Sequence, residues 1–257
     1  MNHAKKIKIL IGLISISITA LFFVDPVPQD LTYHQFADRN SLGGIPNFWN
    51  VISNLPFILA GLLGLVGLRR VNLTAVTGLT KALSLLFYVG LLLTGFGSGY
   101  YHLNPANETL VWDRLPMTIA FMAFFCFVIS IHISERAGRV LLWPLITVGI
   151  ASVFYWAYTE SIGEGDLRFY AVIQFLPMLL IPAIVLMFPS SAYNAIYIWA
   201  VIALYIAAKL GEHFDYQIYE LLSLSGHSFK HVIAAFSGLA FFYALKSVMA
   251  SKYPKTG

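Results

Sequence analysis

The chain has 257 residues, of which 58% are hydrophobic and only 11% are charged. A soluble domain is typically about 45–50% apolar and about 25% charged, so this composition excludes both an ordinary soluble domain and a disordered chain. The single Cys126 excludes a disulfide scaffold, and the net charge of +4 fits cytoplasmic loops of a polytopic membrane protein rather than nucleic-acid binding.

Eight apolar stretches are long enough to cross a bilayer, since a transmembrane helix needs about 20 residues. Prolines at 144, 177 and 182 interrupt the fifth and sixth stretches, but a spanning helix tolerates proline where neighbouring helices satisfy the freed backbone groups. The predicted spans cover residues 7–24, 49–68, 82–103, 114–133, 140–158, 169–188, 193–211 and 228–247.

The first stretch has two interpretations. Lys5, Lys6 and Lys8 precede its apolar run, as in a secretory signal peptide. No small-x-small cleavage site precedes Asp25, however, and the run Ile9–Val24 is long for a signal core. We therefore favour a retained span, with a cleaved signal as the alternative.

The charges fall on two sides of an eight-span arrangement, and Glu135 is the one acidic residue on the basic side. By the positive-inside rule this predicts cytoplasmic termini and an extracytoplasmic acidic side. The inner positive residues are Lys5, Lys6, Lys8, Arg69, Arg70, Lys81, Arg136, Arg139, Lys246, Lys252 and Lys255. The outer acidic residues are Asp25, Asp30, Asp38, Glu108, Asp113, Glu160, Glu164, Asp166, Glu212, Asp215 and Glu220.

Four of the seven histidines map to the ends of spans on the outer side: His102, His213, His227 and His231. His227 and His231 stand four residues apart, which puts both imidazoles on one helix face, as in helical zinc sites. Ionisable residues at a membrane boundary are functional candidates. The alternative interpretation is that these are solvated interface histidines.

Span three ends with Ser98 and His102, again four residues apart and on one face. Gly95 and Gly99 beside them predict close approach of another helix. Asp113 stands at the predicted entrance of span four, where it is a candidate site residue or simply the helix N-cap.

These residues converge on one leaflet from spans three, four and eight. Three histidine ligands with an open fourth position are typical of catalytic zinc, whereas a single cysteine argues against thiolate metal sites. The pattern therefore predicts a zinc site at the outer end of the bundle, with Asp113 and Ser98 nearby.

Four segments of the sequence resemble the alkaline ceramidase family, in the same order and at matching spacing over about residues 33 to 247. The family belongs to a wider superfamily of membrane hydrolases that includes adiponectin-receptor-like proteins. The segments are Asn47–Asn54, Gly97-Ser98-x-x-x-His102, Asp113-x-Leu115-Pro116-Met117 and Gly226-His227-x-x-x-His231.

The resemblance implies an all-α polytopic membrane protein with a seven-helix hydrolase core and one extra N-terminal transmembrane helix. It implies zinc bound by His102, His227 and His231, with Asp113 and Ser98 as catalytic residues. The implied reaction is hydrolysis of the amide bond of ceramide, or of a related lipid amide, to a fatty acid and a sphingoid base or amine.

Animal members of the family also bind calcium near the first core span. The matching positions here are Asp38, Asn40 and Asn47, which offer few of the six to eight oxygens that calcium prefers. His213 and Asp215 lie on the right side of the membrane to support the zinc ligands. Asp113 itself is a candidate general base or a residue that orients a histidine.

We expect an N-terminal helix and linker at 1–30, a catalytic domain at 31–248 and a cytoplasmic tail at 249–257. We expect a membrane-lipid substrate, no nucleic-acid partner and no obligate protein partner, with the active site toward the extracytoplasmic face. The main alternative is a seven-helix lipid receptor or sensor on the same zinc-binding scaffold. A transporter would favour inverted repeats, and a haem protein would use paired histidines.

Overall fold

The structure, a computed structural model, describes residues 1–70 and 77–252. Of the predicted inner charges, Lys255 lies outside these residues, as do the side chains of Arg70 and Lys252. The elements are α1 (His3–Ala20), η1 (Leu21–Phe23), η2 (Leu31–His34), α2 (Phe48–Ile52), α3 (Leu55–Arg70), α4 (Gly78–Leu103), α5 (Asn107–His132), α6 (Glu135–Ser161), α7 (Arg168–Met187), α8 (Ile196–His213), α9 (Asp215–Leu222) and α10 (Gly226–Lys252).

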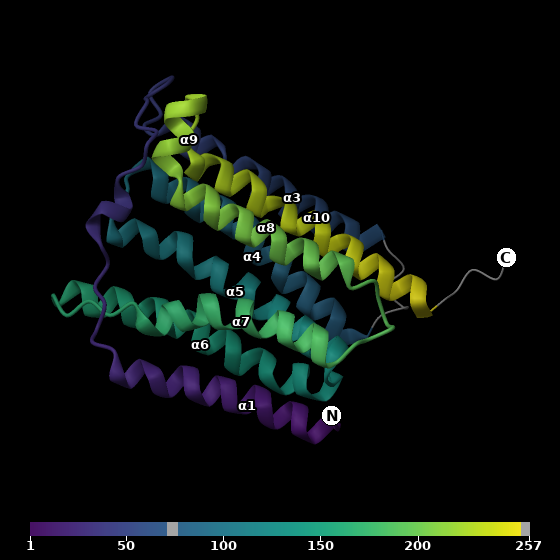
Figure 1. Ribbon diagram of the computed structural model, residues 1–257. Helices are drawn as coiled ribbons and strands as arrows, with labels where there is room; N and C mark the ends of the chain where they lie inside the picture. Colours follow the sequence, from purple (N-terminus) through teal and green to yellow (C-terminus); the bar gives the residue numbers. More distant parts are fainter. Residues whose placement is uncertain (71–76, 253–257) are drawn as a thin grey trace.

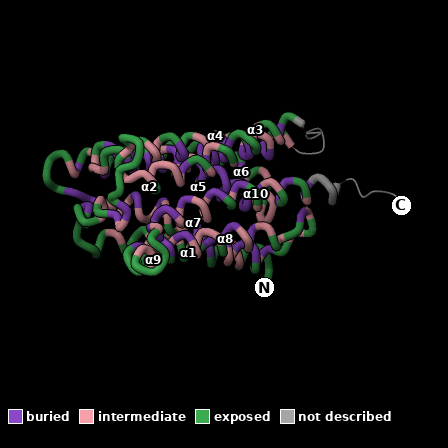
Figure 2. The backbone as a smooth tube through the Cα atoms, turned by 90° about the horizontal axis from the view of Figure 1, so that it is seen from above, coloured by how far each residue is buried: buried purple, intermediate pink, exposed green. Residues whose placement is uncertain are grey.

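Eight helices in the described part of the chain are long and apolar enough to span a membrane, as the sequence predicted. Many of their large apolar side chains face outward, including Leu63, Leu179 and Leu186, which are each at least 70% exposed. Figure 2 shows buried residues along the inner faces of the helices and exposed ones outside. An outer surface of this kind suits lipid rather than water, and the chain is an integral multi-pass membrane protein.

The helices lie in two groups that run along a common direction (Figure 1). One group holds α3, α4, α8 and α10, and the other holds α5, α6, α7 and α1. The extensive contact of α4 with α5 joins the groups, while α1 lies at the edge against α7. The start of α1 and the last turns of α10 lie at the same end, as an even number of spans requires.

A cluster of aromatic rings joins α4, α5 and α10 in the middle of the bundle. The Phe241 ring lies 4.4 Å from that of Phe87 and 4.9 Å from that of Phe127, measured between centroids. The Tyr88 hydroxyl donates to the Gly238 carbonyl oxygen at 2.9 Å, so the one polar atom of this ring is satisfied. This cluster fixes α10 against the helices that carry the other candidate site residues.

Glycines bring α4 close to its neighbours near its C-terminal end. A Cβ atom on Gly97 would lie 1.9 Å from the carbonyl oxygen of Trp112, and one on Gly95 would lie 2.6 Å from the Ile58 side chain. The predicted contact at Gly99 is wrong, because no other helix in the described part of the chain comes within 4 Å of the position that its Cβ would take. The approach at Gly97 places the next residue of α4, Ser98, opposite the turn of α5 that contains Asp113.

Most predicted helix ends differ from the observed ones by a few residues, and two of these differences change an interpretation made from the sequence. α5 begins at Asn107, where the Ala106 amide donates to Thr109 Oγ1 at 3.1 Å, so Asp113 lies nearly two turns inside the helix and is not its N-cap. The sequence prediction started the span where the continuous apolar run starts, but polar residues continue the helix beyond it. α10 extends to Lys252, so residues 249–252 of the predicted tail are helical.

Candidate metal centre

Three histidine side chains meet at the end of the bundle opposite the start of α1: His102 from the last turn of α4, and His227 and His231 from the first turns of α10. Their ring centroids lie 4.8–4.9 Å apart, and their candidate ligand nitrogens all lie within 4.8 Å of one another. All three residues are at most 3% exposed. This is the predicted triad, and it is the one group of three or more His, Cys, Asp or Glu that suits a metal ion in the described chain.

The protonation of His231 follows from its neighbour Ser53. The Ser53 hydroxyl donates its single proton to the Asn50 carbonyl oxygen at 3.1 Å, so its oxygen accepts from His231 Nδ1–H at 2.8 Å. Nε2 then carries the free lone pair, and it is buried without a hydrogen-bond partner among the described residues. A histidine that donates one ring N–H and presents the other nitrogen is arranged as a metal ligand.

His227 is positioned by the loop that precedes α10. Its backbone N–H donates to Asp215 Oδ1 at 3.0 Å, and the Ser225 hydroxyl donates to the same oxygen at 2.5 Å. The other carboxylate oxygen of Asp215 accepts from the Ala37 amide at 2.9 Å. Asp215 therefore satisfies the N-terminus of α10, as a helix-capping aspartate does, and joins it to the segment between η2 and α2 that contains Ala37.

His102 is fully buried, and neither of its ring nitrogens has a partner among the residues that the structure describes. The Phe36 ring covers it, with centroids 4.6 Å from those of both His102 and His227. Asn47 Nδ2 donates to the His102 backbone oxygen at 2.9 Å. Unpaired buried imidazole nitrogens are costly, and a bound metal ion would satisfy one nitrogen of His102 and Nε2 of His231. The triad therefore fits a metal ion.

Asp113 and Ser98 reach the same cavity as His231. The side chains of Ser98 and Asp113 both line this cavity, and both residues are at least 90% buried. The cavity continues between α4, α5, α7, α8 and α10, where most of its lining is apolar. That lining includes Phe57, Phe87, Leu91, Met117, Phe121, Phe124, Met178 and Val201.

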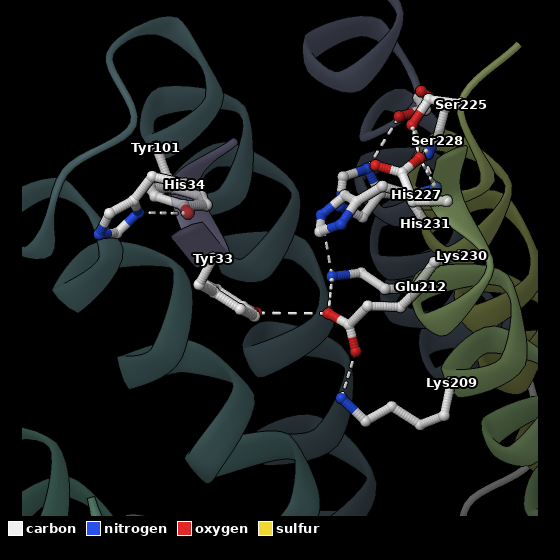
Figure 3. A network of polar contacts seen from close by, with 12 residues as sticks. Tyr33, His34, Tyr101, Lys209, Glu212, Ser225, His227, Ser228, Lys230 and His231 are labelled. Carbon is white, nitrogen blue, oxygen red and sulfur yellow. Dashed lines mark hydrogen bonds and ion pairs between the residues drawn. The ribbon is translucent and has the colours of Figure 1, made fainter. Parts of the chain in front are cut away.

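A charged network also lines this cavity (Figure 3). The Glu212 carboxylate accepts from Lys230 Nζ at 2.8 Å, from Lys209 Nζ, and from the Tyr33 hydroxyl at 3.3 Å. Burial, and then the charge of Glu212, raise the pKa of Tyr33 well above its usual value, so the phenol stays a donor. Lys230 Nζ also lies 3.0 Å from His227 Nε2.

Sequence reasoning missed this network, although signals for it were present. Lys209 and Glu212 stand three residues apart in an apolar helix, a spacing that pairs charges on one face. Phe36, Ser53 and Tyr33 carried no such signal, because their contacts join loops and helices far apart in sequence.

Two further predictions concern His213 and calcium. His213 is exposed and its ring packs against Phe214, so the structure brings Asp215 to the triad but not His213. Asp38 is fully buried and accepts from the Asn40 amide and side chain at 3.1 and 3.0 Å and from the Trp49 amide at 3.0 Å. N–H groups already donate to both carboxylate oxygens of Asp38, and the Asn47 side chain donates to the His102 backbone oxygen instead of facing Asp38. These residues therefore do not fit calcium.

The fold and the site together define a polytopic helical membrane protein with a buried three-histidine centre at one end of a largely apolar cavity. A family model described as Ceramidase matches residues 43–214, and the chain belongs to this family. The family implies a hydrolase that acts on amide bonds. No curated protein matches the chain. The family match includes Ser98, His102 and Asp113 but ends before His227 and His231, so the structure alone brings these two α10 histidines to His102.

Proposed function

We propose that the protein is a zinc-dependent amidase that hydrolyses the N-acyl amide bond of ceramide, or of a related lipid amide, within the membrane. The products are a fatty acid and a sphingoid base or amine. The observation that carries this proposal is the shared cavity, which exposes His231, Asp113 and Ser98 to the same apolar interior.

His102, His227 and His231 would hold the ion, and their three nitrogen ligands favour zinc with one open position. Zinc bound there would make a nucleophile from water near neutral pH and polarise the amide carbonyl. Ser53 holds His231 in the tautomer that presents Nε2, and the Phe36 ring keeps bulk water away from the triad.

Asp113 is placed to serve as the general base. It takes the proton of the attacking water and delivers it to the nitrogen of the leaving amine as the C–N bond breaks. Ser98, which lines the same cavity, donates to the oxygen of the carbonyl as negative charge develops on it. The acyl chain would lie along the apolar part of the cavity, between α5, α7 and α8.

For the membrane arrangement, we propose that both termini are cytoplasmic and that the site faces the extracytoplasmic side. The inner positive residues support this orientation. We also propose that α3 to α10 form the catalytic unit and that α1, which lies at the edge of the bundle, is an addition to it.

The test is a hydrolysis assay with the purified chain in detergent, after chelation and after addition of zinc. The panel contains a ceramide, an N-acylethanolamine and an N-acyl amino acid. We expect release of fatty acid from at least one of these amides, only with zinc. A protein that binds zinc and hydrolyses none of them would be a receptor or sensor on this scaffold, and the proposal would be wrong.

A further inference from the structure

Lys230 lies between the two metal-binding positions of α10, and its side chain points toward the triad (Figure 3). Its Nζ lies 3.0 Å from His227 Nε2 and 2.8 Å from Glu212 Oε1. The side chain is only 17% exposed. A lysine near the end of a spanning helix would normally extend toward the interface, so this inward position needs a cause.

Glu212 supplies that cause, because it holds the ammonium in place. The carboxylate is itself fixed by Lys209 and by the Tyr33 hydroxyl. Lys230 lines the same cavity as His231 and Asp113, so its charge lies beside a metal-binding position and the candidate general base. A donor fixed before the reaction begins does not have to reorganise during it, which is the property of an effective electrostatic catalyst.

We propose that Lys230 is a further catalytic residue, which stabilises the oxyanion of the tetrahedral intermediate. This inference rests on the proposed amidase function. As water adds to the carbonyl carbon, the π electron pair moves onto the carbonyl oxygen, and a Lys230 N–H donates to that oxygen without transferring its proton. The carbonyl re-forms as the C–N bond breaks, and the amine leaves with the proton carried by Asp113.

The positive charge of the Lys230 ammonium also opposes the binding of a zinc ion at the triad. Like charges a few ångströms apart repel, whereas an anionic transition state is attracted. Replacing Lys230 by an apolar residue of similar length should therefore change two quantities in opposite directions. Zinc affinity should rise and kcat should fall. A lysine that only supports the fold would lower both.

The experiment compares Lys230→Met with Lys246→Met in the purified full-length protein. Lys246 lies on the same helix and is exposed. Among the described residues, its ammonium group contacts the Phe242 and Tyr243 rings. Zinc affinity is measured by competition with a chromophoric chelator. The rate is measured at saturating zinc on the amide that the wild-type protein hydrolyses fastest.

For Lys230→Met we expect zinc affinity to rise about tenfold. We expect kcat to fall about 10²-fold, with KM little changed. Lys230→Arg, which keeps a cationic donor, should recover part of kcat, and Lys246→Met should match the wild type in both measurements.

A Lys230→Met variant with unchanged or higher kcat would overturn the proposal, and so would a parallel loss of zinc affinity and rate. If the wild-type protein binds zinc but hydrolyses no lipid amide, the proposed function fails and this inference fails with it. If the wild type hydrolyses a lipid amide while Lys230→Met does so equally fast, only the inference about Lys230 fails.

Discussion

Both ends of the bundle contain histidines inside spanning helices, and the ends differ in what the imidazole nitrogens contact. At the end of α5, His132 Nδ1 lies 2.5 Å from the Phe188 carbonyl oxygen and Nε2 lies 2.6 Å from the Tyr193 hydroxyl. At the opposite end, both nitrogens of His102 and Nε2 of His231 are buried without partners among the described residues. A satisfied histidine holds helices together, whereas a group of unsatisfied ones is ready to bind a cation.

The largest loss of activity is expected from removing one of the three histidine ligands of the triad. His231→Ala should abolish zinc binding and lipid-amide hydrolysis, because two histidines leave the ion short of its three protein ligands. Zinc content and fatty-acid release are measured on the same preparation. A zinc-free variant that retained activity would contradict the assignment of the triad.

Asp113→Asn should cause the second-largest loss of activity. The amide keeps the shape of the side chain but cannot accept the water proton, so kcat should fall about 10²–10⁴-fold while zinc remains bound. Single-turnover rates with zinc-saturated protein check this. If zinc is lost instead, Asp113 acts on the metal ligands rather than on the proton.

Ser98→Ala should have a smaller effect. Loss of one oxyanion donor costs about 2.7–4 kcal/mol of barrier, which corresponds to about 10²–10³ in kcat. Zinc content and the thermal unfolding temperature should stay near those of the wild type, because Ser98 lies beside Gly97 in a tight contact that alanine at 98 does not disturb. An unchanged rate would make Ser98 a packing residue.

The smallest effect on activity is expected for a substitution of His132, at the opposite end of the bundle from the triad. His132→Ala removes two hydrogen bonds and leaves the Tyr193 hydroxyl and the Phe188 carbonyl oxygen without that partner, which should cost about 1–3 kcal/mol of unfolding free energy. Zinc content and kcat should be unchanged. Denaturation in detergent measures the unfolding free energy. A loss of zinc would show that the His132 end of the bundle is coupled to the metal centre.

Much of the fold was predictable, because hydropathy and the distribution of charged residues among the loops can both be read from local sequence. The eight spans are confirmed, with ends displaced where polar residues such as those of 107–113 continue a helix past its apolar part. The four-residue spacing of His227 and His231 also placed two imidazoles on one face in advance.

The supporting contacts were not predictable, because they depend on tertiary packing. Phe36 reaches the triad from a loop, and Ser53 meets His231 across 178 positions in the sequence. Sequence reasoning gave no weight to five positive residues on the outer side, two of which, Lys209 and Lys230, form the network with Glu212. The spacing of Lys209 and Glu212 indicated a charge pair within α8, but the contact of Lys230 with Glu212 joins two helices and leaves no signal in either helix alone.

The most direct test of the central claim is the number of zinc ions bound per chain. The purified protein is stripped with a chelator, reloaded with zinc, freed of excess metal and analysed for metal content beside His102→Ala and His132→Ala. We predict one zinc ion per chain for the wild type and His132→Ala, and none for His102→Ala. Equal zinc content in His102→Ala and the wild type would contradict the three-histidine metal centre.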